Sequence, residues 1–148
     1  MKLSKETVGL FKNYAGVNQN LLLKAGNEIS TISGQKNVMA DATVTETFPQ
    51  DFGIYDLNEF LGAMSLFNDP ELEFSEKFVT IKEGGASIKY FAADQSVLTV
   101  PSRKIAFPEA DIEFTLTATM LNMIHRTASV LRATDFQIIG DGTQITLQ

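Results

Sequence analysis

A helix-like segment that leads into two short apolar stretches around a glycine occurs twice in this chain, at nearly constant spacing. The first copy covers about residues 5–32 with its turn at Gly26, and the second covers about residues 117–147 with its turn at Gly142. Similarity at a fixed offset is the mark of duplicated units. We therefore expect two similar domains, of which the second opens with a helix and a hairpin and is incomplete in this chain.

Local signals predict where the helices begin. The first predicted helix covers residues 5–18 and follows Ser4, a residue type that caps helix N-termini well. The second begins after Asp56, with Glu59 three residues further on in a capping-box pattern, and apolar residues continue at helical spacing as far as Phe67. A third helix is expected within residues 117–133, with one apolar face turned inward.

Strands are predicted where apolar and polar residues alternate or where a short apolar run is bounded by turn residues. The predicted strands cover residues 21–24, 28–33, 37–48, 52–55, 72–74, 78–81, 86–90 and 112–116. We expect the first two of them to pair as a hairpin. The fold class is therefore α+β, with a mainly antiparallel sheet.

The order of these elements divides the chain into three parts. Residues 1–91 contain a full set of helices and strands and form the first domain. Residues 92–111 lack sustained periodicity and include Pro101 and Pro108, which is typical of an interdomain connector. Residues 112–148 form the opening part of the second domain.

Composition excludes several classes of protein. A chain of 148 residues that is 44% hydrophobic is long enough to bury a core. No apolar run reaches the roughly 18 residues that a membrane span needs, and the charged N-terminal segment does not match a secretory signal. The absence of cysteine excludes disulfides and zinc–thiolate sites.

Charge is distributed unevenly along this acidic chain, whose net charge is −6. Residues 1–20 contain three lysines and one acid, and residues 117–133 contain two arginines and no acid. Residues 37–76, in contrast, carry nine carboxylates and neither lysine nor arginine. Basic helices on an acidic body indicate one surface that attracts a polyanion while the remainder repels it.

The first helix gives this surface its clearest pattern. On a helical wheel, Lys5 and Lys12 lie opposite the apolar arc that contains Phe11 and Tyr14. Gly9 lies between the two lysines and lowers the surface, so that a bulky ligand could approach closely. The alternative interpretation is a solvated helix face on which the glycine has no function.

No pattern in the chain predicts catalysis or a cofactor. His125 is the sole histidine, and no motif supplies it with a nucleophile or an acid. The acidic residues 69–76 lack the glycine and the spacing of a calcium loop. Gly84-Gly85 and residues 140–142 match hairpin turns better than phosphate-binding loops. We therefore expect a protein that is not an enzyme, without metal, cofactor or catalytic residues.

Two stretches of sequence carry a family resemblance. The N-terminal Met-Lys-Leu-Ser-Lys-Glu-Thr and the segment Ile-Tyr-Asp-Leu-Asn-Glu-Phe-Leu-Gly at residues 54–62 resemble the sliding clamps of T-even-type bacteriophages, as do Ser65-Leu66 and Asn68-Asp69. The resemblance spans the whole chain. It is weaker over residues 70–100 and in the last helix, where Ser129 occupies a position expected to be basic, and clamps of this family complete the second domain.

The resemblance implies the DNA-clamp fold and the function of a DNA polymerase processivity factor. Such clamps are homotrimeric rings with helices lining the hole, placed around duplex DNA by a clamp loader. They bind the DNA polymerase and late-transcription proteins without making or breaking a bond. The expected location is the bacterial host cytoplasm during infection. The alternative is a self-associating structural or scaffold module with the same fold, which never encloses DNA.

Two sets of residues follow as candidate sites. Charge and helix position, together with the family resemblance, give the DNA-facing set: Lys2, Lys5, Lys12, Arg126 and Arg132. The resemblance also implies that partners insert a short, largely apolar peptide near the connector. The apolar residues available there are Val97, Leu98, Val100, Ile105 and Phe107. The alternative for this second set is simple packing onto the domain.

Overall fold

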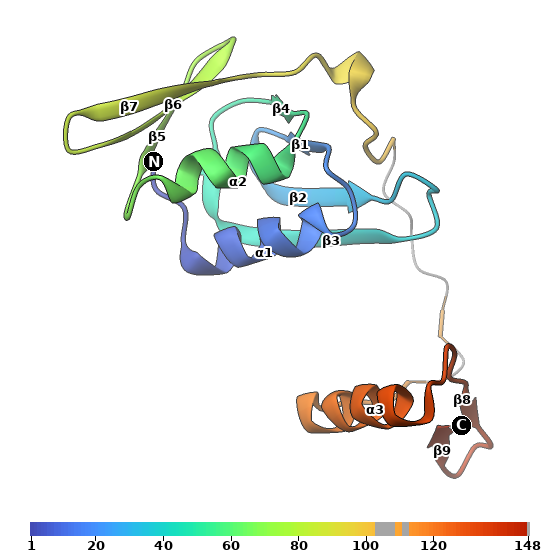
Figure 1. Cartoon of the computed structure of the whole chain (residues 1–148). Coiled ribbons are helices and arrows are strands. Elements are labelled where there is room, and N and C mark those ends of the chain that lie inside the picture. Colours follow the sequence, from blue (N-terminus) through green and yellow to red (C-terminus); the bar gives the residue numbers. More distant parts are fainter. Residues whose placement is uncertain (103–108, 111–112, 148) are drawn as a thin grey trace. The chain divides into compact units, whose positions relative to one another are not determined.

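The structure is a computed structural model and describes residues 1–102, 109–110 and 113–147. The chain divides into two compact units, residues 1–104 and residues 105–148, which we call unit 1 and unit 2 (Figure 1). No helix in the described ranges is long and apolar enough to cross a membrane.

Unit 1 contains two α-helices, and both begin where the sequence predicts. Helix α1 spans Lys5–Ala15, and the Ser4 side chain accepts a hydrogen bond from the backbone N–H of Thr7. Helix α2 spans Leu57–Ser65, and the Asp56 carboxylate accepts bonds from the first-turn amides of Asn58 and Glu59. Both helices end two or three residues earlier than predicted.

The strands of unit 1 form three small antiparallel sheets, which confirms the predicted α+β class. The strands are β1 (Leu21–Leu23), β2 (Gly26–Ile32), β3 (Met39–Phe48), β4 (Phe52–Ile54), β5 (Glu71–Phe74), β6 (Phe78–Glu83) and β7 (Ala86–Phe91). Strand β1 pairs with β4, β2 pairs with β3, and β5, β6 and β7 form a three-stranded meander.

The predicted hairpin between residues 21–24 and 28–33 is wrong. Both strands exist, but β1 pairs with β4, where Leu22 lies opposite Gly53. All three residues of β1 and of β4 are buried, so these short strands lie inside the unit. The chain turns away at Gly26, whose φ of +114° suits glycine, and β2 continues along β3.

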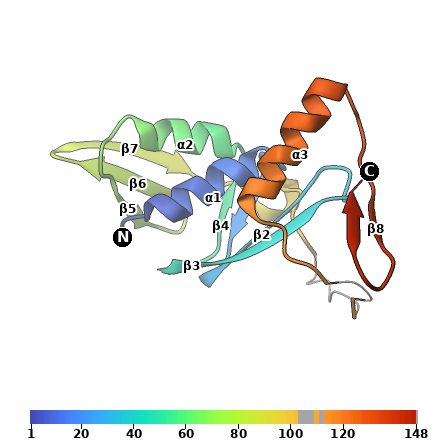
Figure 2. The same cartoon turned by 90° about the horizontal axis from the view of Figure 1, so that it is seen from below.

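The core of unit 1 lies between its two helices and its strands. Helices α1 and α2 contact each other and lie side by side (Figures 1 and 2). Phe11 of α1 and Phe60 of α2 are fully buried, with ring centroids 6.4 Å apart, and Phe60 also meets Tyr90 of β7 at 5.2 Å. Full burial of one such side chain contributes about 1.5–3 kcal/mol. The apolar arc predicted for α1 is therefore the face that fixes this helix in the unit.

Unit 2 contains helix α3 (Ala118–Leu131), which Thr117 caps, and the hairpin of β8 (Ile138–Gly140) and β9 (Ile145–Leu147). The predicted turn is confirmed, with Gly142 at a φ of +85°. The strand predicted over residues 112–116 is absent from residues 113–116, and Ile112 lies outside the described residues. The two copies thus share a helix and two strands but differ in strand pairing.

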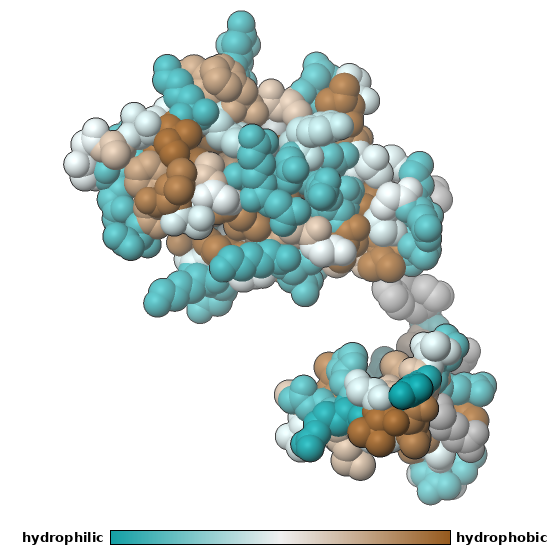
Figure 3. Space-filling view, viewed as in Figure 1, coloured by the Kyte–Doolittle hydropathy of each residue, from teal (hydrophilic) through white to brown (hydrophobic). Residues whose placement is uncertain are grey.

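No described residue of unit 2 is buried. Apolar side chains of α3 that we expected to face inward are exposed, among them Met120, Leu121 and Leu131. Figure 3 shows a patch of apolar side chains on the face of this unit turned toward the viewer. A unit of this size buries too little surface to form a core alone, because the fraction of its surface that a chain buries on folding decreases as the chain becomes shorter.

Candidate functional site

Helix α1 presents a basic face. Lys5 and Lys12 are exposed, whereas Thr7, Phe11 and Tyr14 of the same helix are buried. Within the described residues, neither lysine takes part in an ion pair. A methyl group added at Gly9 would meet no neighbouring group within 4 Å. Because Gly9 has no side chain, the exposed face of α1 is indented between the ammonium groups of Lys5 and Lys12. This shape and charge suit an extended anionic ligand.

Lys2 lies in a different setting. Its ammonium group forms a salt bridge with Asp69, and this hydrogen bond raises the pKa of Lys2. The N-terminal ammonium group of Met1 donates to the carbonyl of Leu72 at 2.7 Å and lies 3.9 Å from Glu71. Lys2 therefore has an acidic neighbour within unit 1, unlike Lys5 and Lys12.

The two arginines of the predicted DNA-facing set lie in unit 2. Arg126 is exposed on α3, in a shallow hollow that it lines together with Met123 and Val130. Arg132 is the exposed residue that ends the helix, with a left-handed backbone at a φ of +53°. The predicted DNA-facing residues are thus divided between the two units.

A carboxylate of strand β3 holds the N-terminus of α1. Glu46 accepts hydrogen bonds from the backbone N–H of Ser4 and from the hydroxyl of Thr7, the latter at 2.6 Å. Burial alone would raise the pKa of Glu46, but these hydrogen bonds outweigh it and lower the pKa from 4.5 to about 2. In a capping box, a glutamate of the helix itself accepts the hydrogen bond from the N-cap backbone N–H. Here Glu46 of strand β3 accepts that bond from Ser4.

Sequence reasoning missed Glu46, although a signal was present. Ala40, Ala42 and Val44 alternate as half-buried residues along β3, and Glu46 continues the same series up to the buried Phe48. A carboxylate at an inward position of a strand needs a hydrogen-bond donor. The donors lie about forty residues away in the chain, so spacing alone could not identify them.

The lowered pKa of Glu46 predicts a pH-dependent contribution to stability. Since the folded-state pKa lies below the ordinary value of 4.5, the contribution is present at neutral pH and is lost as the pH falls from about 5 to about 2. We expect Glu46→Gln to lower the free energy of unfolding by about 1 kcal/mol at pH 7 and by much less at pH 2. Urea unfolding at several pH values measures this difference.

The control for this prediction is Glu76→Gln, at an exposed position between β5 and β6. This variant should match the unaltered chain within about 0.5 kcal/mol over the whole pH range. A difference between the Glu46→Gln variant and the unaltered chain that stays constant from pH 7 to pH 2 would contradict the assigned hydrogen bonds.

The predicted partner-peptide residues fall on the segment that follows β7. Val97 ends the short 3-10 helix Gln95–Val97 and is 57% exposed. Leu98 and Val100 are half-buried. Ile105 and Phe107 lie outside the described residues. The structure therefore places three of the five predicted residues on one short segment of unit 1.

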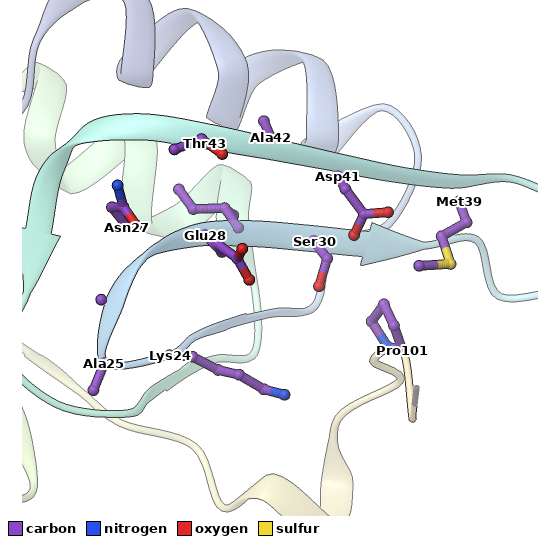
Figure 4. A pocket seen from close by; sticks show the side chains of 12 residues that line it. Lys24, Ala25, Asn27, Glu28, Ser30, Met39, Asp41, Ala42, Thr43 and Pro101 are labelled. Atoms are coloured by element: carbon purple, nitrogen blue, oxygen red, sulfur yellow. The ribbon is translucent and has the colours of Figure 1, made fainter. Parts of the chain in front are cut away.

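A pocket of about 490 Å³ lies between strands β2 and β3 and Pro101 (Figure 4). Its lining combines charged groups, Lys24 and Asp41, with the flexible apolar side chain of Met39. None of its lining residues belongs to the predicted sites. A pocket of mixed polarity beside the segment after β7 adds a concave surface to the region where sequence analysis expected a partner peptide.

This combination of antiparallel sheets and two neighbouring helices, with a basic helix face, is that of a DNA-clamp domain. A family model described as DNA polymerase processivity factor matches residues 4–100. The chain belongs to this family of processivity factors, which confirms the resemblance stated above.

Three relatives are named sliding clamps. That of Vibrio phage KVP40 is 33% identical over 153 residues, covering 99% of this chain and 69% of the relative. That of Enterobacteria phage T4 is 37% identical over 134 residues, covering 89% of this chain and 59% of the relative. That of Escherichia phage RB69 is 30% identical over 150 residues, covering 99% of this chain and 65% of the relative. The chain thus spans between about three fifths and about two thirds of the length of these relatives.

Proposed function

We propose that this chain is part of a phage sliding clamp, which encircles duplex DNA and tethers the replicative DNA polymerase. The observation that carries the proposal is the match of residues 4–100 to the processivity factors, on a unit whose helix α1 exposes Lys5 and Lys12. In this role the chain itself makes or breaks no bond.

The basic face of α1 suits sliding better than sequence recognition. Phosphate contacts carry no sequence information, and a clamp that moves along DNA needs attraction of this kind. A lysine ammonium is a compact point charge, without the planar fork that lets arginine read guanine edges. Each contact is weak and decreases with salt. Enclosure of the DNA within the ring would then supply the long residence time on DNA. The proposed DNA-facing set also includes Lys2, Arg126 and Arg132.

The proposed partners follow from this role. A clamp loader would open and close the ring, and the DNA polymerase and late-transcription proteins would bind near residues 97–107. The ring itself would be a homotrimer of subunits with two similar domains. In this chain, residues 1–91 would form the first domain, residues 92–111 the connector, and residues 112–148 the opening part of the second domain. These events would take place in the cytoplasm of the infected bacterial host.

One observation favours a second candidate function. The exposed apolar side chains of unit 2, including Phe136 and Ile138, form a surface that is suited to association. A module that assembles with copies of itself through this surface would be a structural or scaffold protein and would not enclose DNA.

Retention on closed DNA separates the two candidates. The product of the complete reading frame that contains this chain is incubated with circular nicked DNA, ATP and the clamp loader encoded in the same phage genome, and then separated by gel filtration in high salt. We expect retention on circular DNA and release after one cut that linearises it, because a ring slides off free ends. Equal retention on circular and linear DNA, or none on either, would contradict the clamp function.

A further inference from the structure

Beyond Ala92, whose backbone N–H donates to the carbonyl of Lys77 at 2.9 Å, the segment that follows β7 is attached to the rest of unit 1 at two places. At the first, the backbone N–H of Ala93 donates to the carbonyl of Gly53 in β4 at 2.9 Å. A Cβ atom on Gly53 would lie 2.3 Å from the carbonyl oxygen of Ala93 and 2.9 Å from Cδ1 of Leu98. Glycine at this position therefore allows the segment to lie directly against β4.

At the second place, two asparagines bind the main chain of Thr99. The Asn18 amide nitrogen donates to the Thr99 carbonyl at 2.7 Å, and the Thr99 N–H donates to the Asn20 amide oxygen at 2.9 Å. The asparagines are also joined to each other, because the backbone N–H of Asn20 donates to the Asn18 side chain at 2.9 Å. Both polar groups of the Thr99 main chain are thus bound by side chains far away in the sequence. We call Asn18 and Asn20 the asparagine pair.

The asparagine pair lies on a loop that is fixed at both ends. The backbone N–H of Asn18 donates to the carbonyl of Tyr14 at the end of α1, and the carbonyl of Gln19 accepts from Leu57 at the start of α2. The two side chains bond further, Asn18 to the carbonyl of Ile32 at 2.9 Å and Asn20 to that of Tyr55 at 2.7 Å. A loop tied to both helices is a firm support for the segment that it holds.

The position of Thr99 decides which neighbouring side chains are presented to a partner. Leu98 and Val100, on either side of it, are half-buried, whereas Val97 is 57% exposed. Release of the Thr99 main chain would let these three side chains change their exposure. Binding to a mobile segment is weaker than binding to an ordered one, because the segment must first lose conformational entropy.

We propose that Asn18 and Asn20 are positioning residues of the partner-peptide site, because they hold residues 97–100 in the conformation that a partner recognises. The inference rests on the proposed function, which places partner binding at this segment. As the proposed function implies, the ligand of this site is a short, largely apolar peptide segment of the DNA polymerase. The asparagine pair acts through Thr99 and does not itself contact the peptide.

Hydrogen exchange tests the positioning directly, without any partner. Asn20→Ala removes the acceptor for the Thr99 amide, whereas Asn20→Asp keeps an oxygen at that place and loses only the exposed hydrogen bond to the Tyr55 carbonyl. We expect the Thr99 amide to exchange about tenfold faster or more in Asn20→Ala, and within about threefold of the unaltered chain in Asn20→Asp. The amide of Leu72, which donates to the Met1 carbonyl at 2.7 Å elsewhere in unit 1, serves as the internal reference.

Two results of this exchange experiment would overturn the inference. One is an exchange rate of the Thr99 amide in Asn20→Ala that equals the rate in the unaltered chain. The other is equal acceleration at Thr99 and Leu72, because that pattern reports general destabilisation of unit 1 instead of release of the segment.

Binding of the DNA polymerase encoded in the same phage genome tests the second half of the inference. We expect Asn20→Ala to weaken this binding by about tenfold and Asn20→Asp to restore it to within about threefold. Equal binding by the unaltered chain and by an Asn20→Ala variant with a released Thr99 would overturn the inference. If the unaltered chain does not bind the polymerase, the proposed function fails at this site, whereas the exchange rates still decide whether the asparagine pair positions the segment.

Discussion

The double variant Lys5→Glu/Lys12→Glu should bind duplex DNA at least about tenfold more weakly than the unaltered chain at low salt, with its fold intact. Both lysines are exposed on α1, and each carries a positive charge that no described acid neutralises. If each lysine contacts one phosphate, their loss should reduce the slope of log affinity against log salt by about 2. Processive synthesis by the polymerase should decrease with the affinity.

The fold should tolerate these two substitutions. A glutamate at position 5 lies in the first turn of α1, where negative charge is favourable, and a glutamate at position 12 lies in the last turn, where it is unfavourable. Each effect is below about 1 kcal/mol, and the two oppose each other. Near-ultraviolet circular dichroism of the tyrosines, all three of which belong to unit 1, verifies the fold.

The matched control is Lys36→Glu/Lys77→Glu, which changes the net charge by the same amount at two exposed positions outside α1. A general repulsion between an acidic chain and DNA would weaken binding equally in both double variants. A specific role of α1 requires a larger loss in the first. Equal affinities and equal salt slopes for the two double variants would contradict the assignment of this helix face.

Local chemistry accounts for the parts of the fold that the sequence predicts well. Ser4 and Asp56 cap the helices that follow them because their side chains reach amides within three residues. The meander of β5, β6 and β7 needs only neighbouring strands and a glycine turn. The pairing of β1 with β4 joins residues about thirty positions apart, and no local pattern distinguishes it from the hairpin that we expected.

The same distinction applies to the candidate site. Lys5 and Lys12 could be placed on one exposed face because helical periodicity is local. The salt bridge from Lys2 to Asp69, the bonds of Glu46 and the contacts of the asparagine pair all join distant parts of the chain. The sequence placed Lys2 in the same set as Lys5, whereas the tertiary contacts give Lys2 an acidic neighbour, Asp69. The residues that hold and orient the site are therefore found only in the folded structure.

Shortening Phe11 to alanine should lower the free energy of unfolding of unit 1 by about 3–5 kcal/mol. Phe11 has no exposed surface and joins α1 to α2 through its contact with Phe60. The variant loses the transfer free energy of the ring and leaves a cavity between two helices, which close-packed neighbours fill only in part. Urea unfolding followed by tyrosine circular dichroism measures the loss in unit 1 alone, since Tyr14 and Tyr90 lie in its interior or against its core.

Leu66→Ala is the matched control, because this leucine follows α2 directly but is 73% exposed. Its effect should stay within about 0.5 kcal/mol. Typical domains are stable by only about 5–15 kcal/mol, so the Phe11 variant should lose a large part of the total. Phe11 anchors the helix that carries Lys5 and Lys12. DNA binding by the Phe11→Ala variant should therefore weaken as unit 1 unfolds on heating, and it should recover when unit 1 refolds on cooling. A loss of less than about 1 kcal/mol on Phe11→Ala would mean that α1 is not held by this core, and the basic face would then lack a fixed support.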